Sequence, residues 1–266
     1  MTQISDLEIL ATFETLALKA GCAVMAVYQF DFPVELKADS SPVTEADAKA
    51  EAIILAGLRS AFPDIPCVAE EEASAGICPP ELDGLFFLVD PLDGTREFVN
   101  RNPDFTVNIA LIRQGVPVVG VVYAPARDVL YCASPEGAFR VNTMNHEPGE
   151  RRNIIVRTPT KIPTVVASRS HRTEETDGYI ETCGVVELVS IGSSLKFCLL
   201  AEGEADIYPR FGRTMEWDTA AGDAILRAAG GMTRCVDGSP LTYAKRGQAD
   251  DCDFANPWFI ANTKPA

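Results

Sequence analysis

The chain has 266 residues and a formal net charge of −15, with 23 Lys and Arg residues against 38 Asp and Glu residues. Its basic residues form no cluster beyond short pairs such as Arg151-Arg152, which excludes a surface for the phosphate backbone of nucleic acid and disfavours an anionic membrane surface. A hydrophobic content of 47% is ordinary for a globular protein, and the length predicts two small lobes or one large α/β unit.

The first 60 residues predict two amphipathic helices. Apolar residues recur at three- and four-residue intervals between Leu7 and Val24, and again between Ala46 and Leu58. Residues 37–44 form a polar connection that contains a proline. From residue 66 to residue 139 the pattern predicts strands, including a buried strand over 85–89 and a hairpin formed by 105–112 and 116–122.

A polar and basic segment, residues 142–162, marks the expected boundary between an N-terminal α+β lobe, residues 1–145, and a C-terminal α/β lobe, residues 146–266. In the second lobe, predicted strands alternate with predicted helices, which is typical of a sheet covered by helices. The expected strands are 164–167, 185–190 and 205–208, and the expected helices are 173–183, 194–202 and 218–229.

The chain shows no sign of export. The longest apolar runs are far shorter than the roughly 20 residues that a membrane-spanning helix needs, and acidic residues stand where a secretory signal has a basic region. We expect a cytoplasmic protein, with a peripheral position at the cytoplasmic face of the inner membrane as the alternative. The eight cysteines form no C-x-x-C pair, which predicts reduced and mostly buried residues.

The strand over 85–89 leads into a segment that combines two carboxylates with turn-forming residues. Asp90 and Asp93 are three residues apart, and Pro91 and Gly94 predict a turn. A polar turn is the plain interpretation. The alternative is a site for a hard cation such as Mg²⁺, which prefers oxygen ligands. Gly94 and Thr95 then begin a short helical stretch whose amide groups could face a phosphate.

Three further acidic positions allow both a structural and a functional interpretation. Glu70-Glu71-Glu72 is a run that is usually a solvated face, but it follows a short strand from which a carboxylate could reach Asp90. Asp47 and Asp218 each stand at the start of a predicted helix, where an acidic residue caps the helix or interacts with its dipole. None of these positions would be singled out alone.

The second lobe contains two polar groups next to predicted elements. Gly192-Ser193-Ser194-Leu195-Lys196 is either a helix N-cap or an anion cradle, and Ser168-Arg169-Ser170-His171 follows a strand. The two histidines, His146 and His171, are too few and too far apart for a zinc triad. The sequence has no nucleophile elbow, P-loop or dinucleotide fingerprint, so a Ser/His/Asp hydrolase has no support.

Taken together, Asp47, Glu70-Glu71, Asp90-Pro91-Leu92-Asp93-Gly94-Thr95 and Trp217-Asp218-Thr219-Ala220-Ala221-Gly222 resemble the inositol monophosphatase superfamily of metal-dependent, lithium-sensitive phosphatases. The order and the separations of these segments match from about residue 7 to residue 262. The resemblance implies an α/β (α+β) fold, a layered αβαβα sandwich of the inositol monophosphatase/fructose bisphosphatase type. It also implies an active site between the two lobes.

Other segments resemble one branch of the superfamily, the CysQ-type 3'(2'),5'-bisphosphate nucleotidases. These segments are 37–47, 168–171, 192–198 and 216–219. The resemblance implies hydrolysis of the 3'-phosphate of adenosine 3',5'-bisphosphate, and of its sulfated form, to leave AMP in sulfur assimilation and nucleotide recycling. An inositol or other sugar-phosphate monophosphatase is the alternative, and a non-catalytic metal or nucleotide sensor is a third hypothesis. The expected partner is a small phosphorylated substrate, without a nucleic acid polymer or an integral membrane contact; the oligomeric state is not predicted.

The family pattern implies two or three Mg²⁺ ions and assigns their ligands. The ligands would be Glu70, Asp90, Asp93, Asp218 and the Leu92 carbonyl, while Asp47 and Thr95 would orient and deprotonate the attacking water. The acidic run here has three glutamates where the usual pattern has two. We place the ligand at Glu70 by counting from the preceding strand, and Glu71 is the alternative.

The resemblance also implies a set of residues that contact the substrate. Ser193, Ser194, Lys196 and Arg210 would hold the phosphate that is not cleaved, and His171 would lie near the adenosine. The full set implied to contact the substrate is Glu70, Leu92, Asp93, Gly94, Thr95, His171, Ser193, Ser194, Lys196, Arg210 and Asp218. Such a cation site would reverse the local field of an acidic protein, so that a polyanionic substrate is handled only with the metal present.

Overall fold

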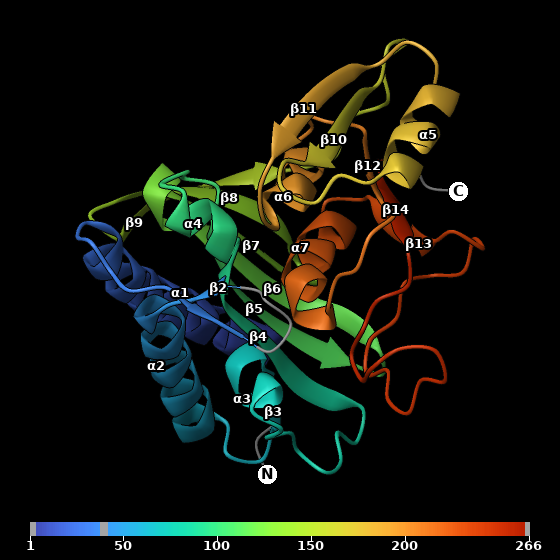
Figure 1. Ribbon diagram of the computed structural model, residues 1–266. Coiled ribbons are helices and arrows are strands. Elements are labelled where there is room, and N and C mark those ends of the chain that lie inside the picture. The colour runs from blue at the N-terminus through green and yellow to red at the C-terminus, as the bar shows by residue number, and fades with distance from the viewer. Residues whose placement is uncertain (1–3, 38–41, 264–266) are drawn as a thin grey trace.

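The computed structural model describes residues 4–37 and 42–263. Five layers are stacked (Figure 1): helices α1 and α2, a seven-stranded sheet, helices α6 and α7, a five-stranded sheet, and helix α5. The predicted αβαβα sandwich is therefore confirmed. Hydrophobic side chains form separate cores on the two faces of the seven-stranded sheet.

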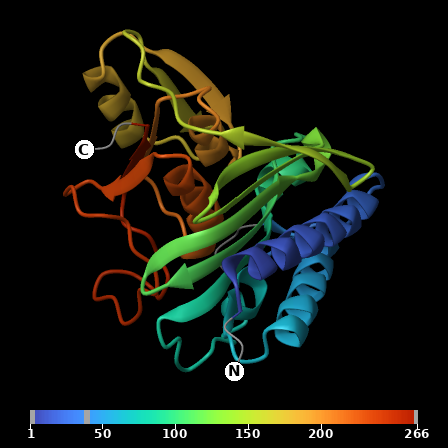
Figure 2. The same cartoon turned by 180° about the vertical axis from the view of Figure 1, so that it is seen from behind.

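Helices α1 (Asp6–Tyr28) and α2 (Glu45–Ala61) cover the outer face of the large sheet, as Figure 2 shows. Both begin with a capping box, in which Ser5 pairs with Glu8 and Thr44 with Asp47. Among the described residues, α1 is the one helix long and apolar enough, by length and composition alone, to cross a membrane. Its periodic apolar residues from Ile9 onward are buried against strands of the sheet, whereas Leu7 is exposed.

The large sheet has the strand order β3-β4-β5-β6-β7-β8-β9, in which β3 and β4 are parallel and the other pairs antiparallel. The predicted hairpin is confirmed as β5 and β6, joined by Gln114 and Gly115, which both have positive φ as tight hairpin turns require. The strands are β3 (Cys67–Ala69), β4 (Leu85–Asp93), β5 (Thr106–Arg113), β6 (Val116–Ala124), β7 (Val129–Ser134), β8 (Gly137–Met144) and β9 (Glu147–Ile154).

Strand β9 lies within the polar and basic segment 142–162, which the sequence predicts to be the boundary between the lobes. Its residues are exposed except for Ile154, so hydrophobic alternation did not reveal it, and pairing with β8 forms the strand. The five-stranded sheet begins only at Thr164. The predicted boundary at residues 145/146 falls in the turn between β8 and β9, and the first sheet continues to Ile154. The first lobe is the part of the chain that ends with β9, at Ile154.

The small sheet has the order β11-β10-β12-β14-β13. The predicted alternation of strands and helices is confirmed from β10 to α7, whereas β13 and β14 were not predicted. The strands are β10 (Thr164–Ser168), β11 (Glu187–Ile191), β12 (Ile207–Arg210), β13 (Met232–Cys235) and β14 (Phe259–Asn262), and the helices are α5 (Glu174–Thr182), α6 (Leu195–Ala201) and α7 (Glu216–Ala228).

Short elements complete the fold. They are β1 (Glu35–Leu36), β2 (Pro42–Val43), α3 (Glu70–Ser74), α4 (Thr95–Val99) and the 3-10 helix η1 (Pro125–Arg127). Residues 38–41, part of one segment that resembles the nucleotidases, lie outside the described residues. The expectation that the cysteines are mostly buried is wrong: Cys67, Cys132 and Cys198 are buried in the sheets and α6, whereas the other five keep some exposure.

Candidate active site

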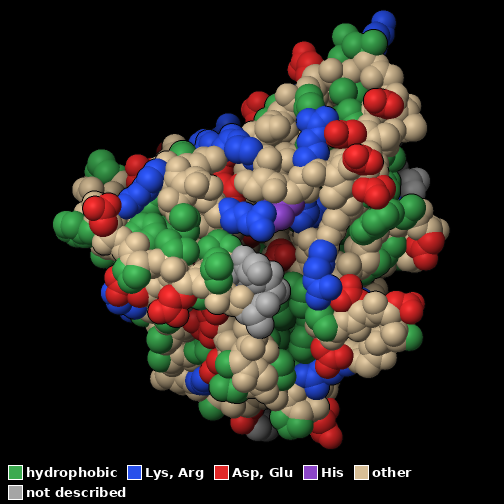
Figure 3. All heavy atoms as spheres, in the orientation of Figure 1, with side chains coloured by type: hydrophobic (Ala, Val, Ile, Leu, Met, Phe, Trp, Pro, Cys, Tyr) green, Lys and Arg blue, Asp and Glu red, His purple; other side chains and the backbone are tan. Residues whose placement is uncertain are grey.

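A cavity of about 220 Å³ lies between the lobes. Figure 3 shows it as a hollow with an acidic side chain at its floor and basic side chains on both sides of a histidine at its rim. Every site residue predicted from the sequence lines this cavity except Asp47, which touches it through Thr95. The fold thus brings together residues as far apart in the chain as Pro42 and Thr219.

The predicted turn after residue 89 is a bulge within β4. Asp90 pairs with Asn108 and Asp93 with Thr106, so that β4 has one more residue than β5 between these two pairs. In a regular strand, side chains three residues apart point to opposite faces. The extra residue removes that alternation, and both carboxylates line the same cavity. Gly94, at φ +92°, then leaves the strand and starts α4.

A side-chain hydrogen bond joins Asp47 and Thr95, the two residues for which the resemblance implies water activation. The Thr95 hydroxyl lies 3.3 Å from Asp47 Oδ1 and 3.2 Å from the Leu92 carbonyl oxygen. Asp47 Oδ2 accepts hydrogen bonds from the backbone and the hydroxyl of Thr44, both at 2.8 Å. Burial nevertheless raises the pKa of Asp47 to about 6. The residue therefore caps α2 and also presents a carboxyl group that titrates below neutral pH.

Four further carboxylates come from three parts of the chain. Glu70 begins α3, Asp90 and Asp93 flank the bulge, and Asp218 lies in the first turn of α7. Helix α7 begins at Glu216, so Asp218 is at its third position and accepts a hydrogen bond from Met215 N at 2.8 Å. Burial, followed by the charges of neighbouring carboxylates, raises the pKa of Asp90 well above its ordinary value. A cation would remove this repulsion.

The donor set fits a hard cation, because carboxylate and carbonyl oxygens are the ligands that Mg²⁺ prefers. Within residues 4–37 and 42–263, no group of three or more Asp, Glu, His or Cys side chains is arranged closely enough to hold a metal ion. Some of the carboxylates have protein partners: Lys37 Nζ lies 2.7 Å from Glu70 Oε1 and 2.6 Å from Glu71 Oε1. Glu70 lines the cavity, and Glu71 is not among its lining residues.

Ser194 connects the carboxylates to the second lobe. Its backbone N–H and hydroxyl lie 2.6 and 2.9 Å from Asp93 Oδ2, and the hydroxyl also lies 2.6 Å from the carbonyl oxygen of Asp218. Ser194 is buried where α6 begins. Ser194, which the sequence predicts to lie in either a helix N-cap or an anion cradle, therefore connects β4 to α7.

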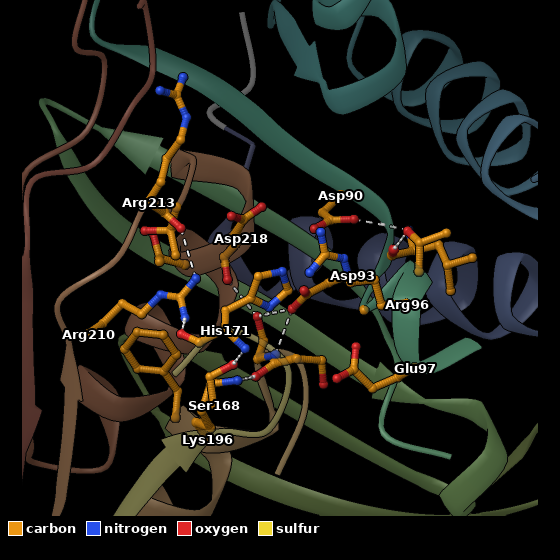
Figure 4. A pocket seen from close by; sticks show the side chains of 18 of the residues that line it. Asp90, Asp93, Arg96, Glu97, Ser168, His171, Lys196, Arg210, Arg213 and Asp218 are labelled. Atoms are coloured by element: carbon orange, nitrogen blue, oxygen red, sulfur yellow. Dashed lines mark hydrogen bonds between the residues drawn. The ribbon is translucent and has the colours of Figure 1, made fainter. Parts of the chain in front are cut away.

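A wall of basic side chains faces the carboxylates (Figure 4). Lys196 is buried and donates to the Ser193 carbonyl at 2.5 Å, and burial lowers its pKa to about 8. Arg210 donates to the carbonyl oxygens of His171 and Arg213, at 3.0 and 2.8 Å, while its buried Nε has no hydrogen-bond partner among the described residues. Partial burial and the neighbouring cations lower the pKa of His171.

Several lining residues were not predicted. Arg96 extends over the cavity toward the His171 ring in Figure 4, and Arg213 and Thr214 lie on the loop that precedes α7. The position of Arg96 next to Thr95 was a usable signal, since a residue that follows the motif directly stays near the site. The loop over 211–215 has no periodicity or motif, and only tertiary packing brings it to the cavity. The remaining unpredicted lining residues are Pro42, Glu97, Ser168, Phe197, Tyr208 and Thr219.

Comparisons with known proteins identify the family. The model of the inositol monophosphatase family matches residues 6–259. The chain is 49% identical to 3'(2'),5'-bisphosphate nucleotidase CysQ of Salmonella typhimurium over 92% of this chain and 95% of the relative. It is 47% identical to the protein of the same name from Escherichia coli K12, with the same coverage.

A solved structure shows the same architecture. The crystal structure of CysQ from Bacteroides thetaiotaomicron, described as a bacterial member of the inositol monophosphatase family, superposes with a TM-score of 0.78. It is 39% identical, and the match covers 96% of this chain and 98% of that one. The fold, the family model and these relatives together show that the chain belongs to the inositol monophosphatase family.

Proposed function

We propose that this protein is a Mg²⁺-dependent 3'(2'),5'-bisphosphate nucleotidase that removes the 3'-phosphate of adenosine 3',5'-bisphosphate, and of its sulfated form, to leave AMP. The observation that carries the proposal is the division of one cavity into a carboxylate cluster and a basic wall. A substrate with two phosphates suits this division, because one phosphate can meet cations held by the carboxylates while the other meets fixed positive charges. The relatives named as such nucleotidases support it.

The cleavage side of the site would hold the metal. Glu70, Asp90, Asp93, Asp218 and the Leu92 carbonyl would bind Mg²⁺, which when bound acidifies a water and stabilises the leaving oxygen.

The protein's own contribution on this side is proton handling and orientation. Asp47 in its charged form accepts the hydrogen bond of the Thr95 hydroxyl, so Thr95 can pass its own proton to Asp47 as its oxygen accepts one from the attacking water. Gly94 and Thr95 lie at the cavity wall where the amides of α4 can orient the phosphate. The Asp47–Thr95 contact argues against a non-catalytic sensor, which needs no water activator.

The second lobe would hold the phosphate that is not cleaved. Lys196 and Arg210 supply positive charge, and the unpartnered Nε of Arg210 is a buried donor that an anion can satisfy. Ser193 and Ser194 add hydroxyl groups. The lowered pKa of His171 keeps its ring neutral at pH 7, which suits contact with an uncharged adenosine. We place the activity in the cytoplasm, in sulfur assimilation and nucleotide recycling.

Phosphate release from a panel of substrates tests the proposal. Adenosine 3',5'-bisphosphate, inositol 1-phosphate, AMP and a sugar monophosphate are compared with and without Mg²⁺. We expect Mg²⁺-dependent release that is much faster from the bisphosphate than from the three monophosphates, and that stops at one phosphate per molecule of bisphosphate. Faster release from inositol phosphate would favour the alternative monophosphatase, and no release from any substrate would favour the sensor.

A further inference from the structure

Asp104, in the loop between α4 and β5, is a fully buried carboxylate shared by two guanidinium groups. Arg127 of η1, in the same lobe, donates from Nε to Asp104 Oδ1 at 2.8 Å. Arg169, which follows β10 in the second lobe, places Nη1 2.6 Å from Asp104 Oδ2. A buried charge is tolerated only when paired, so Asp104 holds the Arg169 side chain in place. Arg169 also donates to the Ser190 carbonyl of β11 at 3.0 Å.

The backbone of the second lobe touches Asp104 directly. Gly192 N donates to Asp104 Oδ2 at 3.3 Å. A Cβ atom on Gly192 would stand 2.7 Å from the Asp104 carbonyl oxygen and 2.8 Å from Cγ of Glu97, so only glycine allows this approach. The next two residues, Ser193 and Ser194, line the cavity. The contact at Gly192 therefore fixes the position of the backbone that leads into Ser193 and Ser194.

Glu97 of α4 makes the matching contact to the other loop of the second lobe. It is buried, and the Ser170 hydroxyl donates to its Oε1. Ser170 precedes His171, whose carbonyl oxygen accepts from Arg210 and whose N–H donates to Ser168 Oγ at 3.1 Å. The position of the His171 loop is thus coupled to α4, which directly follows Asp93 and Gly94 of the cleavage side.

We propose that Glu97, Asp104, Arg169, Ser170 and Gly192 form an interlobe clamp that sets the distance between the cleavage side and the basic wall, and so determines affinity for a substrate with two phosphates. The inference rests on the proposed function. The clamp residues are positioning residues: they act through His171, Ser193 and Lys196. Loosening the clamp weakens binding of a molecule that spans both sides, whereas a small monophosphate that uses the cleavage side alone is unaffected.

Arg169 and Arg127 offer a matched pair of variants. Both bind the same carboxylate, and their side chains are similarly exposed, at 42% and 40%. Of these two arginines, Arg169 belongs to the second lobe and so connects the lobes, whereas Arg127 belongs to the same lobe as Asp104. We expect R169Q to raise KM for adenosine 3',5'-bisphosphate roughly tenfold, since misplacement by about 1 Å can cost up to ~100-fold. Its kcat for p-nitrophenyl phosphate should change less than about twofold, R127Q should leave both substrates nearly unaffected, and R169K should restore part of the loss.

Steady-state kinetics on both substrates, with thermal unfolding of each variant, measures this split. Equal KM values for R169Q and R127Q would overturn the proposal, and so would an equal loss on both substrates. Hydrogen exchange of the full chain without substrate gives a second readout: residues 190–194 should exchange faster in R169Q than in R127Q. If the wild type fails to cleave the bisphosphate, the proposed function fails, while the clamp is still judged by this exchange; identical exchange in the two variants would refute it.

Discussion

Asp47 is predicted to contribute to activity at a cost to stability, and Asp47→Asn separates the two effects. The side chain is 1% exposed, and burial raises its pKa from 3.8 to about 6 despite the two hydrogen bonds from Thr44. Because a tenfold change in acidity corresponds to about 1.4 kcal/mol, charging Asp47 in the folded protein costs about 3 kcal/mol more than in the unfolded chain. Asparagine has the same shape and avoids that cost.

The sign of the effect follows from the raised pKa. Below pH 3.8 the carboxyl group is protonated in both the folded and the unfolded chain, so its raised pKa costs no stability. As the pH rises from 3.8 to about 6, the unfolded chain ionises first, and the folded protein loses stability relative to it. The stability of the wild type relative to Asp47→Asn should therefore fall by about 2.4 kcal/mol between pH 4 and pH 7. Urea unfolding of both chains in the presence of a chelator, at several pH values, measures this difference.

Whereas Asp47→Asn should be more stable than the wild type at pH 7, its activity should be lower. The neutral amide cannot take the proton that Thr95 passes on, so kcat in Mg²⁺ should fall by roughly 100- to 10,000-fold. The wild type should lose activity below a pKa at or under 6, because a cation bound nearby favours the charged carboxylate, and the variant should lack this acid limb.

Glu45→Gln is the matched control, because Glu45 is an exposed acid in the same helical turn, paired with Lys49. Its substitution should change stability by less than about 0.5 kcal/mol at every pH and leave kcat unchanged. The reasoning would be refuted if Asp47→Asn were less stable than the wild type at pH 7, or if its residual activity kept the same acid limb.

Three further predictions concern the metal cluster and the packing. A chelator should abolish phosphate release and Mg²⁺ should restore it. Asp90→Asn should also abolish release, while urea unfolding without metal at pH 7 should show a variant at least as stable as the wild type, because the amide removes a buried carboxylate surrounded by other carboxylates. Full turnover of that variant would remove the metal assignment. Gly120→Ala places a Cβ 2.6 Å from the Ala221 carbonyl oxygen, so calorimetry should show a loss of about 1–3 kcal/mol from overpacking between β6 and α7. Asp206→Ala leaves Arg157 without its carboxylate and should cost about 3 kcal/mol in urea unfolding at pH 7, whereas an unchanged midpoint would contradict the assigned pair.

The sequence alone determined the elements whose signal is local. Apolar periodicity predicted α1 and α2, and the two apolar runs around Gln114 and Gly115 predicted the β5–β6 hairpin, because both patterns depend on neighbours within a few residues. The segments that contain Asp47, Glu70, Asp90 and Asp218 resemble the inositol monophosphatase family, and the comparisons confirm this family. Strand β9 escaped prediction since its residues are exposed and its formation depends on pairing with β8.

Tertiary structure alone decided how the site is assembled. The bulge between Asp90 and Asp93 exists because β4 pairs with a β5 that is one residue shorter there, and no local pattern in β4 reports the length of its partner. The approach of Gly192 to Asp104 depends likewise on how two sheets pack. Local sequence fixes propensity and spacing, whereas the direction of a buried side chain is set by contacts made with residues far away in the chain.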